Sequence, residues 1–295
     1  MAMKQSALAC MVCGHESPQP YLSGCSWRWH EVPYRLVRCS ACGSAYTDPL
    51  PDDATLSEYY QRHFDYRWYA DHYQAKLRDA RIRVAEYLPL IAGSRILDYG
   101  GGLGYFSQAL REAGKESLTY DPYASGDDSG SGWDAVVALH ALEHANDPAT
   151  AIARMKARLR PGGKLLLAVP NFESIGYRQL GMAWVWAQPP IVHVYHFTAR
   201  GLTQLLVRHG FAGIQCRYRE RWDANRVADL ERRGLSKFCD QAWALHPLNR
   251  FAAYRRTVAR WNAARRFAAL AMAERQGERP EERAELEVIA TLAEC

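Results

Sequence analysis

The residue types best suited to binding a ligand lie near the middle of the chain, where one aspartate precedes four glycines: Asp98, Gly100, Gly101, Gly102 and Gly104. An apolar stretch precedes the aspartate, and a stretch with helical character follows the last glycine. Glycine has no Cβ and accepts positive φ, so such a loop lets a ligand approach the backbone closely. The helix behind the loop directs unpaired N–H groups at that ligand, which favours an anionic or carboxylate group.

A second acid follows the loop. The segment Ser117-Leu-Thr-Tyr-Asp121 has the pattern of a strand that ends in an acid, and an acid there can accept both ribose hydroxyls of a nucleoside. Two kinds of ligand compete: a dinucleotide, and a nucleoside joined to an amino acid. A dinucleotide loop receives a pyrophosphate on its glycines. Asp98 would repel that group but could receive an ammonium group, which favours the second kind of ligand.

Two cysteine pairs near the start of the chain suit a metal. Each pair has C-x2-C spacing and a glycine after it, as Cys10-Met-Val-Cys13-Gly and Cys39-Ser-Ala-Cys42-Gly. Four thiolates brought together suit a closed, tetrahedral structural zinc site, so we predict a zinc ribbon. Two unrelated cysteine pairs, or a redox pair, are the alternative. Three neighbouring candidates are expected not to bind the metal: His15, Cys25 and His30.

Four histidines are candidates for proton transfer, because an imidazole titrates near neutral pH. Two of them occur in the segment His140-Ala-Leu-Glu143-His144, where a structural role in orienting the next helix is the alternative for Glu143 and His144. The other two, His193 and His196, follow an aromatic segment at 171–190 that contains Phe172, Tyr177, Trp184 and Trp186. Such histidines are more commonly buried and hydrogen-bonded than catalytic. Of the two, His193 is the better candidate for a general base.

The elements that must position these residues alternate along the chain. Strands are predicted at 95–98, 117–121, 134–139, 164–169 and 211–219, and helices at 104–113, 148–159 and 199–209. This alternation predicts an α/β fold with a Rossmann-like, doubly wound and mostly parallel sheet. Ligands of such sheets bind at the carboxyl ends of the strands, where Asp98, Gly100, Asp121 and His140 all fall. The segment 122–132 is too short for a helix and a further strand, so we expect that unit to be missing.

Motifs and composition divide the chain into five parts. These are a zinc ribbon at 1–52, a helical linker or lid at 53–92, a core at 93–221, an Arg- and Ala-rich helical insertion at 222–283 and a last core strand at 284–295. A helix is the alternative for the last part. Tyr59, Tyr60 and Tyr69 in the linker either pack between ribbon and core or supply hydroxyls to a lid. Arginines in the insertion form either a solvated helix face or a dock for a phosphorylated or nucleotide-linked acceptor: Arg250, Arg255, Arg256, Arg260, Arg265 and Arg266.

The bulk composition favours a cytoplasmic protein. A chain of 295 residues with 48% hydrophobic content can bury one large core and carry an appendage. No apolar run is long enough to span a membrane, and the N-terminal apolar stretch is too short for a signal peptide. The net charge of +5 argues weakly for an anionic partner.

Taken together, these motifs resemble the class I S-adenosylmethionine (SAM)-dependent methyltransferases. Asp98 to Gly104 is similar to motif I of that family, Trp133 to His144 to its fourth strand and following loop, and Leu159 to Pro170 to its Pro-Gly-Gly turn and fifth strand. The segment from His193 to Phe211 is similar to the small-molecule branch that includes the ubiquinone-type O-methyltransferases. The resemblance implies SAM as cofactor, bound by Asp98, Tyr99, Gly100, Gly101, Gly102, Gly104, Tyr105, Phe106, Asp121, Pro122, Tyr123, Leu139 and His140.

The resemblance further implies methyl transfer to a small-molecule acceptor, namely a sugar, nucleotide-sugar or secondary metabolite, with O-methylation favoured. The candidate catalytic residues are His193, His196, His140 and His144. The sequence lacks the Asn/Asp-Pro-Pro-aromatic signature that grips the amines of nucleobases, which counts against a nucleobase N-methyltransferase. Two alternatives stay open: an RNA methyltransferase that uses the ribbon and the arginine-rich helices, and a SAM-binding partner protein without catalysis.

Overall fold

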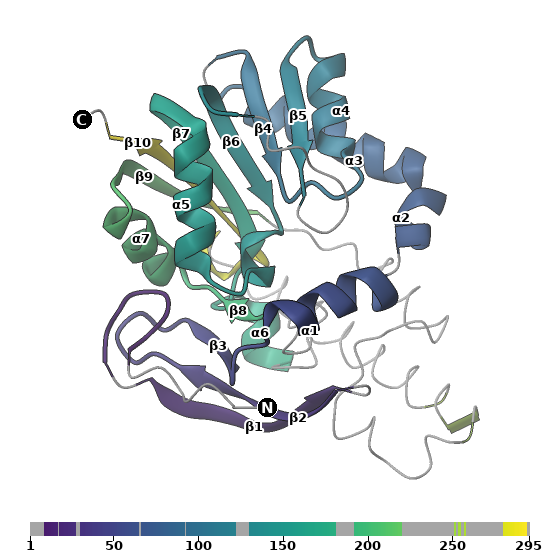
Figure 1. Ribbon diagram of the computed structural model, residues 1–295, viewed down its shortest axis with the longest axis vertical. Helices are drawn as coiled ribbons and strands as arrows, with labels where there is room; N and C mark the ends of the chain where they lie inside the picture. Colours follow the sequence, from purple (N-terminus) through teal and green to yellow (C-terminus); the bar gives the residue numbers. More distant parts are fainter. Residues whose placement is uncertain are drawn as a thin grey trace.

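A six-stranded sheet forms the centre of the protein (Figure 1). Its strands run in the order β5-β4-β6-β7-β10-β9, with β4 to β7 parallel and β10 antiparallel to both neighbours. The strands are β4 (Arg95–Tyr99), β5 (Glu116–Tyr120), β6 (Trp133–Leu139), β7 (Leu159–Pro170), β9 (Phe211–Arg219) and β10 (Glu285–Leu292). The computed structural model describes residues 9–16, 18–27, 30–64, 66–91, 93–121, 130–180, 192–219, 251, 253–254, 257 and 280–293.

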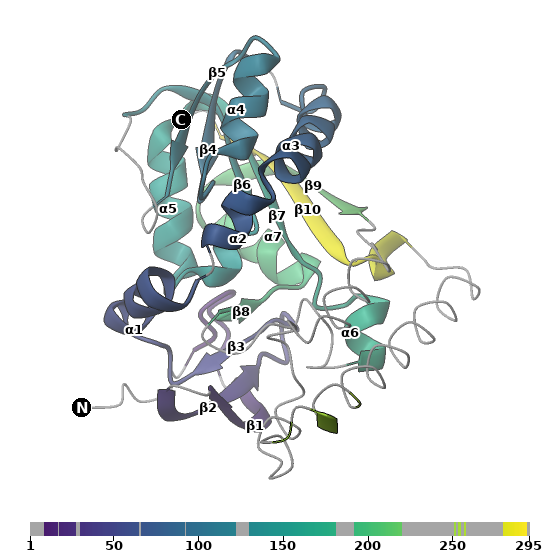
Figure 2. The same cartoon turned by 90° about the vertical axis from the view of Figure 1, so that its right-hand side faces the viewer.

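Helices cover both faces of the sheet (Figures 1 and 2). Helices α3 (Tyr73–Tyr87) and α4 (Tyr105–Glu112) pack on one face, and α5 (Pro148–Arg158) and α7 (Ala199–Arg208) pack on the other. Successive residues of a strand point to opposite faces, so in β6 Ala135 and Val137 join the first layer while Val136 and Ala138 join the second. The predicted doubly wound α/β sheet is confirmed.

Strand β5 forms one edge of this sheet within the described residues. The connection from Asp121 to Trp133 is described only at residues 130–132, so the expected loss of a strand–helix unit stays a prediction. Residues 122–129 belong to this connection and lie outside the described residues, so the predicted contacts of Pro122 and Tyr123 remain predictions.

The N-terminal part forms a second, smaller sheet from β1 (Gln19–Trp27), β2 (His30–Arg38) and β3 (Ala45–Asp48). Its fourth strand, β8 (Tyr195–His196), comes from much later in the sequence, and Ala45 pairs with His196. The Thr47 N–H also donates to the Val194 carbonyl at 2.9 Å. The segment that carries His193 and His196 is therefore held by backbone hydrogen bonds to the cysteine-bearing part.

The predicted helical linker at 53–92 is broken into four pieces: α1 (Asp53–Glu58), a π-helix (Tyr59–His63), α2 (Tyr66–Asp71) and α3. The break at Phe64 has extended backbone, with φ −74° and ψ 130°. It allows Tyr59 and Tyr60 to be buried against Tyr34 of β2 and Val192, rather than following one straight helix. The aromatic stripe thus packs between the two sheets.

Several expectations concern residues outside the described part of the chain. These are Trp184 and Trp186 of the aromatic segment and the arginine run from Arg250 to Arg266. The aromatic segment begins, within the described residues, with helix α6 (Ile175–Leu180), and a 3-10 turn (Pro280–Glu282) precedes β10. Among the described helices, none combines the length and the apolar character needed to cross a membrane.

Candidate functional site

The glycine loop lies at the carboxyl end of β4, where the chain turns from Tyr99 into α4. Gly100 has φ 73° and donates its N–H to the Tyr120 carbonyl at 2.6 Å. A Cβ at Gly100 would lie 2.4 Å from the Cβ of Ala141, so no other residue fits there without a shift of the loop after β6. The loop after β4 therefore contacts the ends of both β5 and β6.

Asp98 lies beneath this loop and is 1% exposed. Its Oδ2 accepts a hydrogen bond from the Ser107 N–H at 3.2 Å, in the first turn of α4. A Cβ at Gly101 would lie 2.2 Å from the same oxygen, so the loop backbone passes directly over the carboxylate. Burial raises the pKa of Asp98 to about 7, with the Ser107 hydrogen bond opposing the shift and the nearby Asp121 adding to it.

Asp121 follows β5 and approaches the loop from the other side. Its Oδ2 accepts a hydrogen bond from the Gly102 N–H at 2.8 Å. Within the described residues, the nearest atom to a Cβ built at Gly102 is this same oxygen, at 4.0 Å, so the loop is open there. The two acids from neighbouring strand ends thus flank the glycine loop, one from beneath and one beside Gly102.

Other residues predicted to bind the cofactor have side chains that pack rather than face the loop. The hydroxyl of Tyr105 donates to the Tyr69 carbonyl at 2.7 Å, and Phe106 is buried against Tyr87. The Tyr99 ring lies 5.0 Å from that of Tyr120. These side chains therefore position the loop through packing.

His140 ends β6 with a positive φ of 52°. Its Nε2 lies 2.7 Å from Glu285 Oε2, and its Nδ1 lies 3.2 Å from Glu143 Oε1. Burial lowers the pKa of the ring, but the hydrogen bonds to Glu143 and Glu285 outweigh it and raise the pKa to about 9. His140 is therefore a cation at neutral pH, which disfavours the role of proton acceptor predicted for it.

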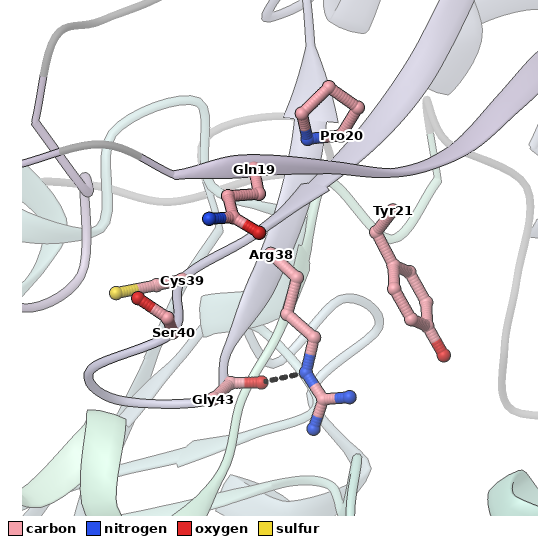
Figure 3. A pocket seen from close by; sticks show the side chains of 7 residues that line it. All are labelled: Gln19, Pro20, Tyr21, Arg38, Cys39, Ser40 and Gly43. Atoms are coloured by element: carbon pink, nitrogen blue, oxygen red, sulfur yellow. Dashed lines mark hydrogen bonds between the residues drawn. The ribbon is translucent and has the colours of Figure 1, made fainter.

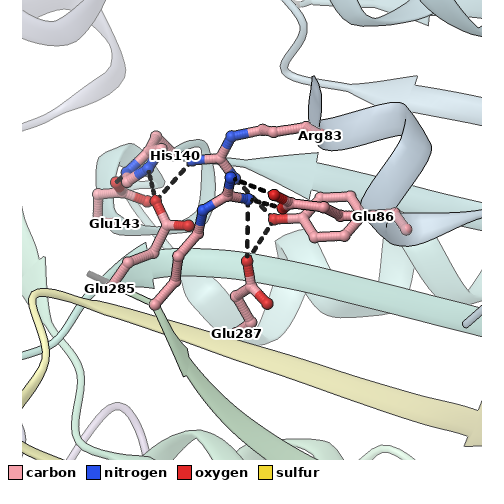
Figure 4. Close-up of polar contacts among 8 residues, drawn as sticks. Arg83, Glu86, His140, Glu143, Glu285 and Glu287 are labelled. Atoms are coloured by element: carbon pink, nitrogen blue, oxygen red, sulfur yellow. Dashed lines mark hydrogen bonds and ion pairs between the residues drawn. The ribbon is translucent and has the colours of Figure 1, made fainter. Parts of the chain in front are cut away.

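The contact between His140 and Glu285 belongs to a buried polar network that joins α3 to β10 (Figure 4). Arg83 donates to Glu285 at 2.6 Å and to the Tyr87 hydroxyl at 2.7 Å, and that hydroxyl donates to Glu287 at 2.6 Å. Burial raises the pKa of Glu285, but Arg83 and His140 outweigh it and lower the pKa to about 2. Sequence reasoning missed this network, since no motif links α3 to a strand about 200 positions away.

His144 and His193 lie next to Glu143. The loop after β6 forms a 3-10 turn (Leu142–His144), and His193 follows Val192. The Nδ1 of His144 donates to the Val192 carbonyl at 2.5 Å, and its ring lies 4.7 Å from that of His193, edge to face. The ligand atoms of Glu143, His144 and His193 all lie within 4.8 Å of one another.

His196 lies in β8 and is 4% exposed. Its ring packs 5.2 Å from Phe172, and its Nε2 has no hydrogen-bond partner among the described residues. Burial lowers the pKa of His196 to about 4, so the ring is neutral at physiological pH. The structure brings His144 and His193 together with Glu143, while His196 packs against the aromatic segment.

The four cysteines predicted to bind zinc meet in one cluster. Their sulfurs all lie within 4.8 Å of one another, with Cys10 and Cys42 at 3.9 Å and Cys13 and Cys39 at 3.6 Å. Tetrahedral ligands at about 2.3 Å from a zinc ion are separated by about 3.8 Å, so the spacing fits that metal. In each knuckle the glycine has positive φ and donates its N–H to the carbonyl of the first cysteine at 2.8 Å.

The cysteine-bearing N-terminal part also has a surface hollow of its own, with a volume of ≈ 320 Å³ (Figure 3). Arg38 projects into it, donates to the Gly43 carbonyl at 2.9 Å and lies 5.4 Å from the centre of the Tyr21 ring. The hollow is lined by Gln19, Pro20, Tyr21, Arg38, Cys39, Ser40 and Gly43. These residues belong to the cysteine-bearing part, so this hollow is separate from the glycine loop.

The arrangement of the loop, its two acids and the doubly wound sheet can be compared with known proteins. A family profile described as a methyltransferase domain matches residues 69–215. The protein is a class I SAM-dependent methyltransferase. The matched range of the methyltransferase includes β4, the glycine loop, Asp121 and both histidine segments. A comparison with curated proteins found no match.

Solved structures similar to this methyltransferase share its fold. Phosphoethanolamine N-methyltransferase 2 of Haemonchus contortus, in complex with phosphomonomethylethanolamine and S-adenosylhomocysteine, is 13% identical with a TM-score of 0.52, covering 85% of this chain and 63% of that chain. A SAM-dependent methyltransferase from Archaeoglobus fulgidus is 17% identical with a TM-score of 0.46, covering 77% of this chain and 100% of that chain. The similarity is one of fold alone.

Proposed function

We propose that this methyltransferase transfers the methyl group of SAM to a small-molecule acceptor, preferably to an oxygen of a sugar, a nucleotide-sugar or a secondary metabolite. The observation that carries the proposal is the open glycine loop between two acids, with Gly102 N–H bonded to Asp121. On this proposal the ribose hydroxyls of SAM bind Asp121, and its amino-acid part lies along Gly100 to Gly104. Asp98 holds the loop from below, on the side where the ammonium group would lie.

The acceptor is proposed to bind beside His144 and His193. The ring of Tyr60 lies 6.3 Å from that of His144, edge to face, and Tyr60 belongs to a buried cluster with Tyr34 and Tyr59. These tyrosines come from two separate parts of the chain and would keep water away from the acceptor. In a displacement reaction, much of the catalysis comes from aligning the reactants and excluding water. A buried aromatic environment favours a small molecule, rather than an RNA strand, as the acceptor.

Proton removal from the acceptor is assigned to His193 rather than to His140 or His196. His140 is held as a cation between two carboxylates, and His196 is buried against Phe172. His193 stands next to His144, in the aromatic surround proposed for the acceptor. The S–CH3 bond would break as the O–CH3 bond forms, leaving S-adenosylhomocysteine.

The cysteine cluster is proposed to hold a structural zinc ion. Support comes from the sulfur spacing, the two glycine knuckles and the burial of Cys10, Cys39 and Cys42. The ion would be bound by thiolates of Cys10, Cys13, Cys39 and Cys42 and would supply cross-linking, with no part in the transfer. The hydroxyl of Thr198 donates to the Cys42 carbonyl at 2.6 Å and also caps α7, so the cluster is joined to the catalytic domain.

The proposed function is tested by following methyl transfer from radiolabelled SAM. The purified protein is incubated with panels of nucleotide-sugars, phenols and RNA, and the labelled product is analysed. Methylation of a small hydroxylated compound is the expected result. Transfer to RNA alone would overturn the small-molecule assignment, and SAM binding without transfer to any panel would favour a non-catalytic SAM-binding protein.

A further inference from the structure

We propose that Glu143, His144 and His193 form a binding site for a divalent transition-metal cation beside the methyl donor. Each residue offers one ligand atom, and these atoms all lie within 4.8 Å of one another. Two imidazole nitrogens and one carboxylate oxygen suit Mn²⁺, Fe²⁺, Co²⁺ or Zn²⁺ and leave further positions open. The site is chemically distinct from the cysteine cluster, whose ligands are all sulfur.

The ring of His144 is already oriented for such a role. Its Nδ1 donates to the Val192 carbonyl at 2.5 Å, and a carbonyl oxygen can only accept, so Nδ1 carries the proton. The other nitrogen, Nε2, is directed toward Glu143 Oε1 at 4.0 Å. Metal-binding histidines commonly donate their second N–H to a backbone carbonyl in this manner, which fixes the orientation of the ring.

Glu143 provides an independent indication of a missing ligand. Its side chain is 1% exposed, and Oε1 is engaged by His140. The second oxygen, Oε2, is buried and has no hydrogen-bond partner among the described residues. A buried carboxylate oxygen without a partner is unfavourable, and a bound cation would satisfy it.

The position of the site connects it to the reaction. Glu143 and His144 belong to the loop after β6, and Ala141 of this loop contacts the glycine loop at Gly100. Ligands around a transition metal stand about 3 Å apart, so the three side chains must rotate slightly inward when the ion binds. The side chain of His144 is 19% exposed, the most of the three, and leaves a side for the acceptor.

The role of the ion rests on the proposed function. A bound cation would hold the acceptor hydroxyl oxygen and lower its pKa, so that its proton leaves to solvent before transfer. The oxygen then forms the O–CH3 bond while the S–CH3 bond breaks and its electron pair stays on sulfur. His193 would then be a ligand and not the proton acceptor.

The test uses the full chain, supplied with only about one equivalent of zinc per chain so that the thiolate cluster is filled and the second site stays free of zinc. Mn²⁺ is added and the signal of free Mn²⁺ is followed by electron paramagnetic resonance. Wild type is expected to bind about one equivalent of Mn²⁺, and Glu143→Gln and His193→Gln to bind it at least about tenfold more weakly. The matched control is His209→Gln, since the Nδ1 of His209 also bonds a backbone carbonyl, that of Leu205 at 2.8 Å, without lying in the cluster.

Two results would overturn the cation site: no Mn²⁺ binding by wild type, or binding that Glu143→Gln and His193→Gln leave unchanged. SAM affinity and zinc content are measured on the same samples, so misfolded variants are recognised. Protein that binds SAM but not Mn²⁺ refutes this inference alone. Protein that binds the cation but not SAM refutes the proposed function and leaves the cation site standing.

Discussion

The carboxylate of Asp121 and the backbone N–H of Gly102 form a 2.8 Å hydrogen bond across the ends of two neighbouring strands. The bond joins the acid after β5 to the loop after β4, and it places the acid where a ribose would approach the glycines. In the proposed complex the ribose hydroxyls would donate to the same carboxylate.

Replacement of Asp121 by alanine is expected to weaken SAM binding by about tenfold to a hundredfold, because hydrogen bonds to a charged group contribute about 1.5–3 kcal/mol. Calorimetric titration with SAM measures this effect. Glu116→Gln, at the opposite end of β5 in an exposed pair with Arg95, is the matched control and should bind SAM as wild type does. Unchanged affinity of the Asp121 variant would remove the ribose assignment.

The buried carboxyl of Asp98 predicts a pH dependence of stability. Its pKa of about 7 in the folded protein lies above the ordinary value of 3.8, so its contribution to stability is lost as pH rises through 7. Between pH 6 and pH 8 this loss amounts to about 1.4 kcal/mol. The Asp98→Asn variant stays neutral and should lack this contribution. Urea unfolding of both proteins at the two pH values checks it, and an identical pH dependence would contradict the raised pKa.

The buried network predicts very different costs for two arginines of α3. Arg83→Met removes the buried cation that pairs with Glu285 and donates to the Tyr87 hydroxyl, and it is expected to cost about 3–5 kcal/mol of unfolding free energy. Arg81→Met removes an exposed ion pair with Glu112 and should have no measurable effect. Urea denaturation compares the two variants. Equal stabilities would show that the network does not hold α3 to β10.

The cysteine cluster predicts about one zinc ion per chain, bound by four thiolates. Cys39→Ser is expected to lose the metal and to lower the melting temperature, because β3 is paired with β8 of the catalytic part. Elemental analysis and thermal unfolding measure these changes. Cys216→Ser, which alters an exposed thiol of β9, is the control and should retain the metal. A stable, metal-free wild type would refute the zinc proposal.

The sequence by itself determined the chemistry-bearing segments and the sheet that carries them. A strand covered by helices on both faces is predicted by a continuous apolar run, as in β6, where Ala135 and Val137 face one helical layer and Val136 and Ala138 the other. The glycine loop, Asp121 and the cysteine pairs are likewise local in sequence. Their meeting at one edge or in one cluster follows from general rules of parallel sheets and knuckle spacing.

Only the tertiary structure decided the state and surroundings of each histidine. His140 lies between Glu143 and Glu285, and the second of these is 145 positions away. His196 pairs with Ala45 of the ribbon, and His144 bonds to Val192. A histidine's pKa and orientation depend on the charges and burial that distant segments bring to it, and periodicity along one segment carries no information about those partners.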